Sequence, residues 1–149
     1  DSRVGAFGAM ALCVTIGLRA ALLAELDTSA PIALIVTECL SRLTPIWLMF
    51  CMPYVSADDR AKSRQVARTR FSQVLVATVL AGLPCIAMFW TQQISVWQCT
   101  ALLAAGAVCG VVCGWRFHRR AGGITGDFLG AVQQLSQLAM LAVLLWPLT

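Results

Sequence analysis

The stretch Phe71–Trp90 reads FSQVLVATVLAGLPCIAMFW and contains no charged side chain. A helix rises about 1.5 Å per residue, so a stretch of this length can cross the ~30 Å hydrocarbon layer of a membrane. Inside lipid the backbone N–H and C=O groups find no water, and a helix satisfies them internally. This stretch therefore predicts a transmembrane helix rather than a segment of a soluble domain.

Four further apolar blocks of similar length flank this stretch. The chain of 149 residues is 59% hydrophobic and 12% charged, whereas ordinary soluble domains are roughly 25% charged. This composition excludes a disordered chain, a disulfide-stapled secreted module and an ordinary soluble domain. The sequence predicts an all-α fold, a polytopic transmembrane helix bundle of about five spans, as a single membrane domain over residues 1–149. The other four blocks are Val4–Leu23, Pro31–Phe50, Trp97–Trp115 and Phe128–Trp146.

The basic residues gather in segments that five alternating spans would place on one side of the membrane. Nine of the eleven Lys and Arg residues lie at the start of the chain or in two loops. Because loops rich in Lys and Arg stay on the cytoplasmic side, this side is predicted to be cytoplasmic and the C-terminus to face outward. The nine are Arg3, Arg60, Lys62, Arg64, Arg68, Arg70, Arg116, Arg119 and Arg120. Tryptophans are expected at the inner interface (Trp47, Trp115) and at the outer one (Trp90, Trp97, Trp146).

The cysteines and the single histidine give no sign of a metal or redox site. Seven cysteines lie in or beside apolar blocks and none forms a CxxC pair, so we expect small buried apolar residues, with a metal or redox role as the lesser alternative. His118 has no partner at motif spacing, so metal-binding and His-based catalytic motifs are absent. The basic loop Arg60–Arg70 would suit lipid headgroups or nucleic acid, but no nucleic-acid-binding module is recognisable. No nucleic acid partner is expected.

The stretch Arg119–Asp127, RRAGGITGD, precedes the last apolar block and is the strongest candidate for binding phosphate. Glycines let a ligand approach the backbone, and the free N–H groups at a helix N-terminus favour phosphate. Arginines add charge-assisted bonds to phosphate oxygens, and Asp127 can hold Mg²⁺ beside them. The alternative is a flexible turn in which Thr125 or Asp127 caps the helix and the arginines only orient the protein. The candidate phosphate-binding residues are Arg119, Arg120, Gly122, Gly123, Thr125 and Gly126.

Glu38 and Arg42 are ionisable residues inside the second apolar block. They are four residues apart, so they share a helix face and can pair. Charged residues within a span usually face an interior cavity or one another. Both interpretations stay open: a structural pair, or two residues that line a substrate cavity. Arg19 lies nearer the outer end of its span and is expected to snorkel outward, without a function.

Small and polar residues on the last two blocks predict how these helices pack. The doubled GxxxG pattern of Gly106, Gly110 and Gly114 predicts close helix packing. Gln133, Gln134 and Gln137 make one side of the last helix polar, and interhelical hydrogen bonds are the expected reason.

Two segments together resemble the cobalamin synthase (adenosylcobinamide-GDP ribazoletransferase) family. Asp1–Gly8, DSRVGAFG, is similar to the family motif D-S-R-[IVL]-G-x-x-G, and Gly122–Ala131, GGITGDFLGA, is similar to its signature G-G-x-T-G-D-x-L-G-A. Pro53–Val55 followed by Lys62–Arg64 resembles the middle cytoplasmic loop of the family. Because order and spacing also fit, the resemblance extends over the whole chain.

The resemblance implies a transferase of late adenosylcobalamin (vitamin B12) biosynthesis in the bacterial inner membrane, with its site on the cytoplasmic side. It would join α-ribazole, or its 5′-phosphate, to adenosylcobinamide-GDP and release GMP, with Mg²⁺ as cofactor. Asp127, Arg3 and Arg42 would then be catalytic, and Asp127 and Asp1 would hold the metal. Ser2 and Glu38 would bind substrate together with the phosphate-binding residues given above.

The chain departs from the family pattern in two ways. Family members run further upstream through more spans and an aspartate-rich H-L-D-G-x-x-D-type motif, so this chain is expected to correspond to their C-terminal part. The family also commonly has glutamates where this chain has Gln134 and Gln137. The alternatives are a non-catalytic membrane transporter component or an inactive truncated synthase. A phosphotransferase acting on lipid alcohols is a further option, but the D-G-x-x-A-R signature of that class is absent.

Overall fold

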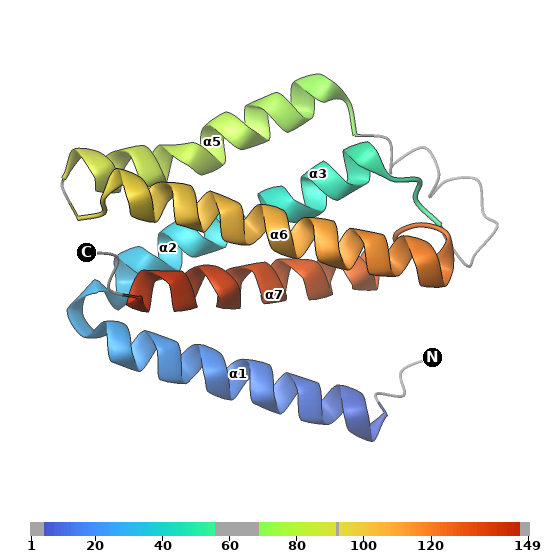
Figure 1. Cartoon of the computed structure of the whole chain (residues 1–149), viewed down its shortest axis with the longest axis horizontal. Coiled ribbons are helices and arrows are strands. Elements are labelled where there is room, and N and C mark those ends of the chain that lie inside the picture. The colour runs from blue at the N-terminus through green and yellow to red at the C-terminus, as the bar shows by residue number, and fades with distance from the viewer. Residues whose placement is uncertain (1–4, 56–68, 92, 147–149) are drawn as a thin grey trace.

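A computed structural model describes residues 5–55, 69–91 and 93–146, and nearly all of them are helical (Figure 1). Within these ranges there is no β-strand, only an isolated parallel β-bridge between Tyr54 and Ile124. The predicted all-α class is therefore confirmed. The helices are α1 (Ala6–Leu26), the 3₁₀ turn η1 (Asp27–Ser29), α2 (Ala30–Ser41), α3 (Leu43–Cys51), α5 (Phe71–Trp90), α6 (Val96–Ala121) and α7 (Gly126–Leu145).

Four helical segments in the described residues are long and apolar enough to cross a membrane. The first, Ala6–Cys51, has 46 residues and covers two of the five predicted blocks. It turns back at η1, so that α1 and the α2–α3 pair run in opposite directions (Figure 1). The other three are α5, α6 and α7. The predicted number of spans is thus close to the observed one, and the chain is a polytopic helix bundle.

Two local features shape the first helical segment. Asp27 follows α1 with φ +45°, a positive value that residues other than glycine seldom adopt, and the chain reverses there. Pro45 has no N–H to donate to the carbonyl of Ser41, and its ring crowds that carbonyl. The helix therefore breaks at Arg42, where α2 ends and α3 begins.

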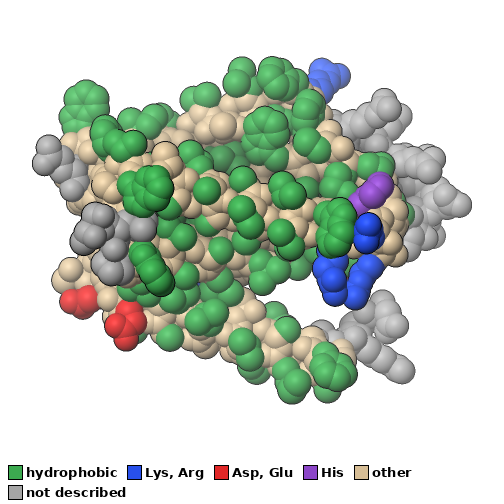
Figure 2. All heavy atoms as spheres, viewed as in Figure 1, with side chains coloured by type: hydrophobic (Ala, Val, Ile, Leu, Met, Phe, Trp, Pro, Cys, Tyr) green, Lys and Arg blue, Asp and Glu red, His purple; other side chains and the backbone are tan. Residues whose placement is uncertain are grey.

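The helices run between two ends of opposite charge (Figure 2). The first residues of α1, α5 and α7 and the last residues of α3 and α6 lie together at one end, which we call the basic end (Figure 1). Its described cationic residues are Arg70, Arg116, Arg119 and Arg120. The opposite end, the acidic end, carries Glu25 and Asp27. Trp90, Trp97 and Trp146 lie at helix termini of the acidic end, while Trp47 and Trp115 lie nearer the basic end, as the sequence predicts.

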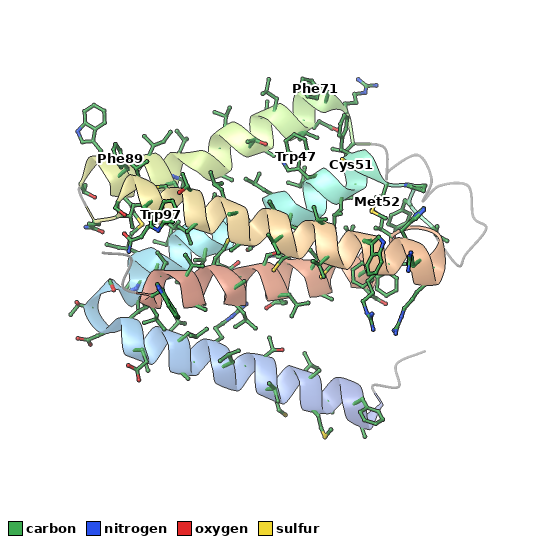
Figure 3. The ribbon with its side chains drawn as sticks, in the orientation of Figure 1. Trp47, Cys51, Met52, Phe71, Phe89 and Trp97 are labelled. Carbon is green, nitrogen blue, oxygen red and sulfur yellow. The ribbon has the colours of Figure 1, made fainter. Side chains whose placement is uncertain are left out.

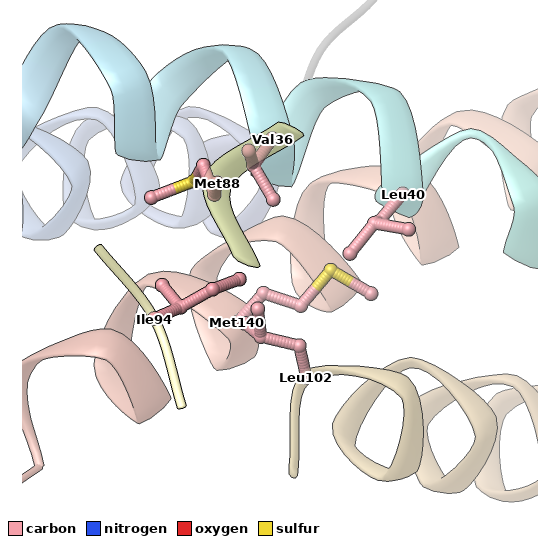
Figure 4. Packing of buried hydrophobic residues seen from close by; sticks show 6 residues of the cluster. All are labelled: Val36, Leu40, Met88, Ile94, Leu102 and Met140. Atoms are coloured by element: carbon pink, nitrogen blue, oxygen red, sulfur yellow. The ribbon is translucent and has the colours of Figure 1, made fainter. Parts of the chain in front are cut away.

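Most large apolar side chains face outward, as expected for a bundle surrounded by lipid (Figure 2). Most of the buried apolar residues belong to two clusters, one toward each end of the bundle, and the larger is drawn in Figure 4. The cysteines are less buried than predicted: all seven are free, Cys13 and Cys51 are exposed, and the other five are half-buried. The larger cluster comprises Val36, Leu40, Met88, Ile94, Leu102 and Met140, and the smaller Leu48, Ile124 and Val132.

The glycine stripe of α6 packs against α3 and α7, as the sequence predicts. Gly106, Gly110 and Gly114 are all buried. A Cβ atom at Gly110 would lie 2.9 Å from Cγ2 of Thr44, and one at Gly106 would lie 2.5 Å from Cε of Met140. Hydrocarbon provides no hydrophobic force between helices, so this close approach itself stabilises the contact through van der Waals packing.

Gly110→Leu is expected to lower the free energy of unfolding by about 1–3 kcal/mol, because the new side chain pushes α3 away from α6. Gly82→Leu is the matched control, since nothing lies within 4 Å of a Cβ atom at Gly82. Unfolding of both variants in mixed micelles measures the difference between their free energies of unfolding. Equal stability of the two variants would show that the stripe is not a packing contact.

Candidate functional site

The glycine-rich turn joins α6 to α7 at the basic end. Gly122 ends α6 with φ +71°, and its N–H donates to the carbonyl oxygen of His118 at 2.9 Å. This left-handed conformation favours glycine over other residues. Thr125 caps α7, and its hydroxyl accepts from the N–H of Phe128 at 3.4 Å. The predicted helix start is therefore confirmed, with Thr125 rather than Asp127 as the cap.

The segment after α3 fixes this turn in place. The N–H of Ile124 donates to the carbonyl oxygen of Pro53 at 3.1 Å, and the N–H of Val55 donates to the carbonyl oxygen of Ile124 at 2.8 Å. Ile124 is fully buried. Two segments that the sequence singled out separately, Pro53–Val55 and Gly122–Asp127, thus form one structural unit.

Gly123 is the residue that permits this contact. A Cβ atom there would lie 2.4 Å from the carbonyl oxygen of Pro53 and 2.5 Å from Cγ2 of Val55. Since one of these neighbours is backbone, the two segments would have to separate to admit any other side chain. The glycine is therefore needed for packing between two backbone segments, in addition to any role in binding phosphate.

Gly123→Ala is expected to cost about 1–3 kcal/mol of stability and to separate the Pro53–Val55 segment from the turn. The control is Gly130→Ala, because nothing lies within 4 Å of a Cβ atom at Gly130 and alanine favours a helix by roughly 0.5–1 kcal/mol over glycine. Hydrogen exchange at the amides of Val55 and Ile124 reads out the contact directly. Unchanged exchange in Gly123→Ala would contradict this assignment.

The cations of the basic end point in two directions from α6. Arg119 lies over the ring of Trp115, with 4.5 Å between the guanidinium carbon and the ring centroid. Arg120 follows Phe117 by three residues, and residues three apart share a helix face. The ring of Phe117 stacks on Phe128 of α7 at 4.2 Å between centroids, so Arg120 belongs to the side of α6 that faces α7.

Asp127 lies in the first turn of α7 and is exposed. A carboxylate there is favoured by the helix dipole and lies on the same short stretch as the glycines and Arg120. Asp1, Ser2 and Arg3 lie outside the described residues, as do the basic residues between 60 and 68. Their predicted roles remain predictions.

A second polar cluster lies inside the bundle, between α1, α2 and α7. The side chain of Gln137 donates to Oε1 of Glu38 at 2.8 Å. Arg19 donates to the side-chain oxygens of Gln134 and Gln137, and its guanidinium is 3.8 Å from Oε1 of Glu38. Arg19 and Gln137 lie seven and eight residues before the ends of their helices, which places the cluster about 10–12 Å from the acidic end.

This cluster corrects the expectation for Arg19 and excludes one of the two open interpretations of Glu38 and Arg42. Arg19 does not snorkel outward but joins three helices. Among the described residues the one salt bridge is Arg19–Glu38, so Glu38 does not pair with Arg42. Arg42 is exposed at the break between α2 and α3.

The signal for this arrangement was present in the sequence as the glutamines of the last block. Gln134 and Gln137 were expected to bond across helices, and that expectation is confirmed. Their partner was missed because an arginine near a span end usually reaches the interface instead.

The two polar regions lie along one face of α7. Asp127, Gly130, Gln134 and Gln137 follow one another at spacings of three or four residues, which keeps them on one side of a helix. Asp127 and Gln134 are seven residues apart, about 10 Å along the axis. The first three of these residues are exposed, and Gly130 has open space beside it.

An opening separates this face from the first half of α1. All of residues 5–14 are exposed, and the half-buried residues of α1 begin at Thr15. Figure 2 shows the opening near the basic end, with Lys and Arg side chains on its rim. The arrangement is a wedge with cations and Asp127 at its mouth and the cluster around Arg19 at its narrow end.

The donor set at the mouth of the wedge suits one metal ion held together with a substrate. No group of three or more His, Cys, Asp or Glu side chains converges within the described ranges. A protein-only cage is therefore not formed by these residues. Mg²⁺ commonly uses one or two carboxylates, several waters and substrate phosphates, and an exposed Asp127 beside cationic groups fits that mode of binding.

Comparisons with known proteins agree on one family. Residues 1–145 match the model of the family described as cobalamin-5-phosphate synthase. Curated relatives named adenosylcobinamide-GDP ribazoletransferase include those of Shewanella woodyi (38% identical over 97% of this chain) and Leptothrix cholodnii (35% over 93%). The matches cover 56% and 54% of these relatives, so the chain spans about half their length. No solved structure matches the chain.

Proposed function

Because this chain belongs to the cobalamin-5-phosphate synthase family, we propose that it carries out the transfer of α-ribazole, or of its 5′-phosphate, onto adenosylcobinamide-GDP. The curated relatives are named for this reaction. Family membership favours a transferase over a transporter component. The substrates are assigned to this chain as part of the proposal.

The observation that carries the proposal is the fixed glycine-rich turn at the start of α7. Its backbone is held by Pro53 and Val55 through two hydrogen bonds. The N–H groups at the helix N-terminus are therefore already in position before a ligand binds. Such N–H groups favour anions, and a preorganised site loses little entropy when a diphosphate binds. Arg120 and Asp127 flank the same turn.

The proposed reaction is a displacement at phosphorus. A hydroxyl oxygen of the ribazole attacks the phosphorus that is attached to cobinamide and forms the new P–O bond. The bond from this phosphorus to the bridging oxygen breaks, and GMP leaves with that oxygen. The proton of the hydroxyl passes to solvent, so atoms and charge balance.

The residues of the chain would act mainly by positioning and by neutralising charge, which supply most of the catalysis in phosphoryl transfer. The turn and Arg120 would bind the oxygens of the diphosphate. Asp127 would hold Mg²⁺, which when bound neutralises charge on those oxygens. The cluster of Arg19, Glu38 and Gln137 would fix α1 relative to α7 and so keep the wedge open.

We assign the basic end to the cytoplasm and the protein to the bacterial inner membrane. The described residues at this end include Arg70, Arg116, Arg119 and Arg120, which flank the ends of the spans, and such basic flanks remain on the cytoplasmic side. A cytoplasmic site is also consistent with phosphorylated, water-soluble substrates that reach the mouth of the wedge without crossing the membrane.

Binding of a guanine nucleotide tests the proposal. GDP is titrated calorimetrically into nanodiscs that carry this chain, with and without Mg²⁺. We expect binding that requires Mg²⁺ and that weakens at least about tenfold in Arg120→Gln, the loss typical of one charge-assisted contact. Arg70→Gln is the matched control, because Arg70 precedes α5, whose packing partners are α2, α3 and α6. Absence of binding, or equal loss in both variants, would overturn the assignment.

A further inference from the structure

An apolar groove lies between α3, α5 and α6, on a different side of α6 from the wedge. It has a volume of about 470 Å³, within the roughly 300–1,000 Å³ typical of small-molecule sites. Its walls are almost entirely apolar. The residues used in the argument below are Trp47, Thr78, Leu103, Ala107, Gly110 and Trp115.

The groove exists because α5 packs mainly against α2 and α3 and contacts α6 little. The buried residues of α5 are Val74 and Met88, fourteen positions apart. Between them α5 stands away from α6 (Figure 1), and Thr78 lines the space. The glycine stripe of α6 adds depth, since Gly110 presents no side chain to the groove. Figure 3 shows Trp47 projecting from α3 between these helices.

The groove has the depth of one leaflet of a membrane. Its wall on α6 runs from Leu103 to Trp115, about 18 Å along the helix. Half of a ~30 Å hydrocarbon layer is about 15 Å. Leu103 and Val111 are 54% and 71% exposed, so the groove opens sideways to the surrounding chains.

The groove is apolar and elongated, which suits the acyl chain of a lipid. A void left empty inside lipid would forfeit van der Waals contacts along both walls.

The basic end of the groove has the features of a site for an anionic headgroup. Trp115 closes this end, and Arg119 lies over its ring at 4.5 Å. His118 follows Gly114, another groove residue, by four positions and so continues the same face of α6. Of the carboxylates that the structure describes, only Asp127 lies at this end, and it starts α7, which faces the wedge.

From these observations we propose that the groove binds one acyl chain of an anionic phospholipid, with its phosphate held by Arg119 beside Trp115. The acyl chain gains little by leaving bulk lipid, because lipid tails and groove walls are equally apolar. Selectivity among phospholipids therefore comes from the headgroup. A basic residue near the membrane surface favours an anionic lipid by about fivefold.

Quenching by brominated lipids tests the proposal. Trp90, Trp97 and Trp146, which lie at the acidic end, are replaced by phenylalanine, so that fluorescence comes from Trp47 and Trp115. The protein is reconstituted with phosphatidylcholine that contains small fractions of dibrominated phosphatidylglycerol or dibrominated phosphatidylcholine. We expect half-maximal quenching at an about fivefold lower fraction of the anionic lipid.

Two pairs of variants separate the groove from the general membrane surface. Ala107→Phe fills the groove and should remove the preference, whereas Val108→Phe, at a neighbouring exposed position outside the groove, should retain it. Arg119→Gln should remove the preference without changing quenching by phosphatidylcholine, and Arg116→Gln should retain it. Equal quenching by both lipids in the parent protein, or the same change in both members of each pair, would overturn the proposal.

Discussion

Asp127→Asn is expected to reduce the release of GMP from adenosylcobinamide-GDP at least about a hundredfold, the scale on which one charge-stabilising group contributes to such reactions. Asparagine keeps the shape of the side chain but loses the charge that would hold Mg²⁺. The fold should be almost unaffected, because Asp127 is exposed and Thr125 provides the helix cap. Loss of the dipole interaction costs only about 0.3–1 kcal/mol. Chromatographic measurement of GMP at saturating Mg²⁺ gives the rate.

The matched control for this prediction is Asp27→Asn. Asp27 is also an exposed aspartate beside a helix end, but it lies at the acidic end, far from the turn. The Asp27→Asn variant should retain normal release of GMP. Near-normal turnover in Asp127→Asn would remove Asp127 from the site. Because the proposed GDP binding requires Mg²⁺ and Asp127 would hold this ion, Asp127→Asn should also weaken GDP binding.

Arg19→Leu is expected to lower the free energy of unfolding by about 2–3 kcal/mol, because it leaves Glu38 charged and without its cation inside the membrane. Gln137 still donates to Glu38 at 2.8 Å, which limits the loss. Glu38→Leu should cost less, since Arg19 keeps the side-chain oxygens of Gln134 and Gln137 as acceptors. The measurement is unfolding of reconstituted protein by steric trapping.

The double variant Arg19→Leu/Glu38→Leu shows whether the two charges interact. We expect it to be more stable than Arg19→Leu alone, because neither charge then remains unpaired. Arg42→Leu serves as the control: this arginine lies in the same helical segment as Glu38 but has no ion pair among the described residues, so its loss should change stability little. If the double variant lost as much free energy of unfolding as the two single variants together, the two charges would not be coupled.

Sequence patterns predicted the elements of this fold well because each element is encoded locally. Twenty uncharged residues specify the helix Phe71–Trp90 whatever its neighbours are. The GxxxG spacing of Gly106, Gly110 and Gly114 likewise indicates a packing face without naming its partner. The turn at Gly122–Asp127 was identified as a helix start from its glycines and its Thr and Asp residues. The structure confirms each of these.

The contacts between distant segments were not predictable in the same way. Nothing in the local sequence of Arg19 shows that α7 will present two glutamine oxygens to it. The pairing of Tyr54 with Ile124 joins residues seventy positions apart, and β-bridge partners are chosen by three-dimensional packing rather than by spacing along the chain. The interpretation of Glu38 and Arg42 as a pair failed because the partners of Glu38 are Arg19 of α1 and Gln137 of α7, which the local sequence does not reveal.

The bridge between Tyr54 and Ile124 also bears on how the protein is made. A ribosome adds roughly 5–20 residues per second, so the partner of the Pro53–Val55 segment emerges several seconds after that segment. During this interval the carbonyl of Pro53 and the N–H of Val55 have to be satisfied by water at the membrane surface. The glycine-rich turn can thus become ordered only after α6 and the residues that follow it have been synthesised. A nascent chain that stalled after α6 would be inserted in the membrane but would not yet have assembled its site.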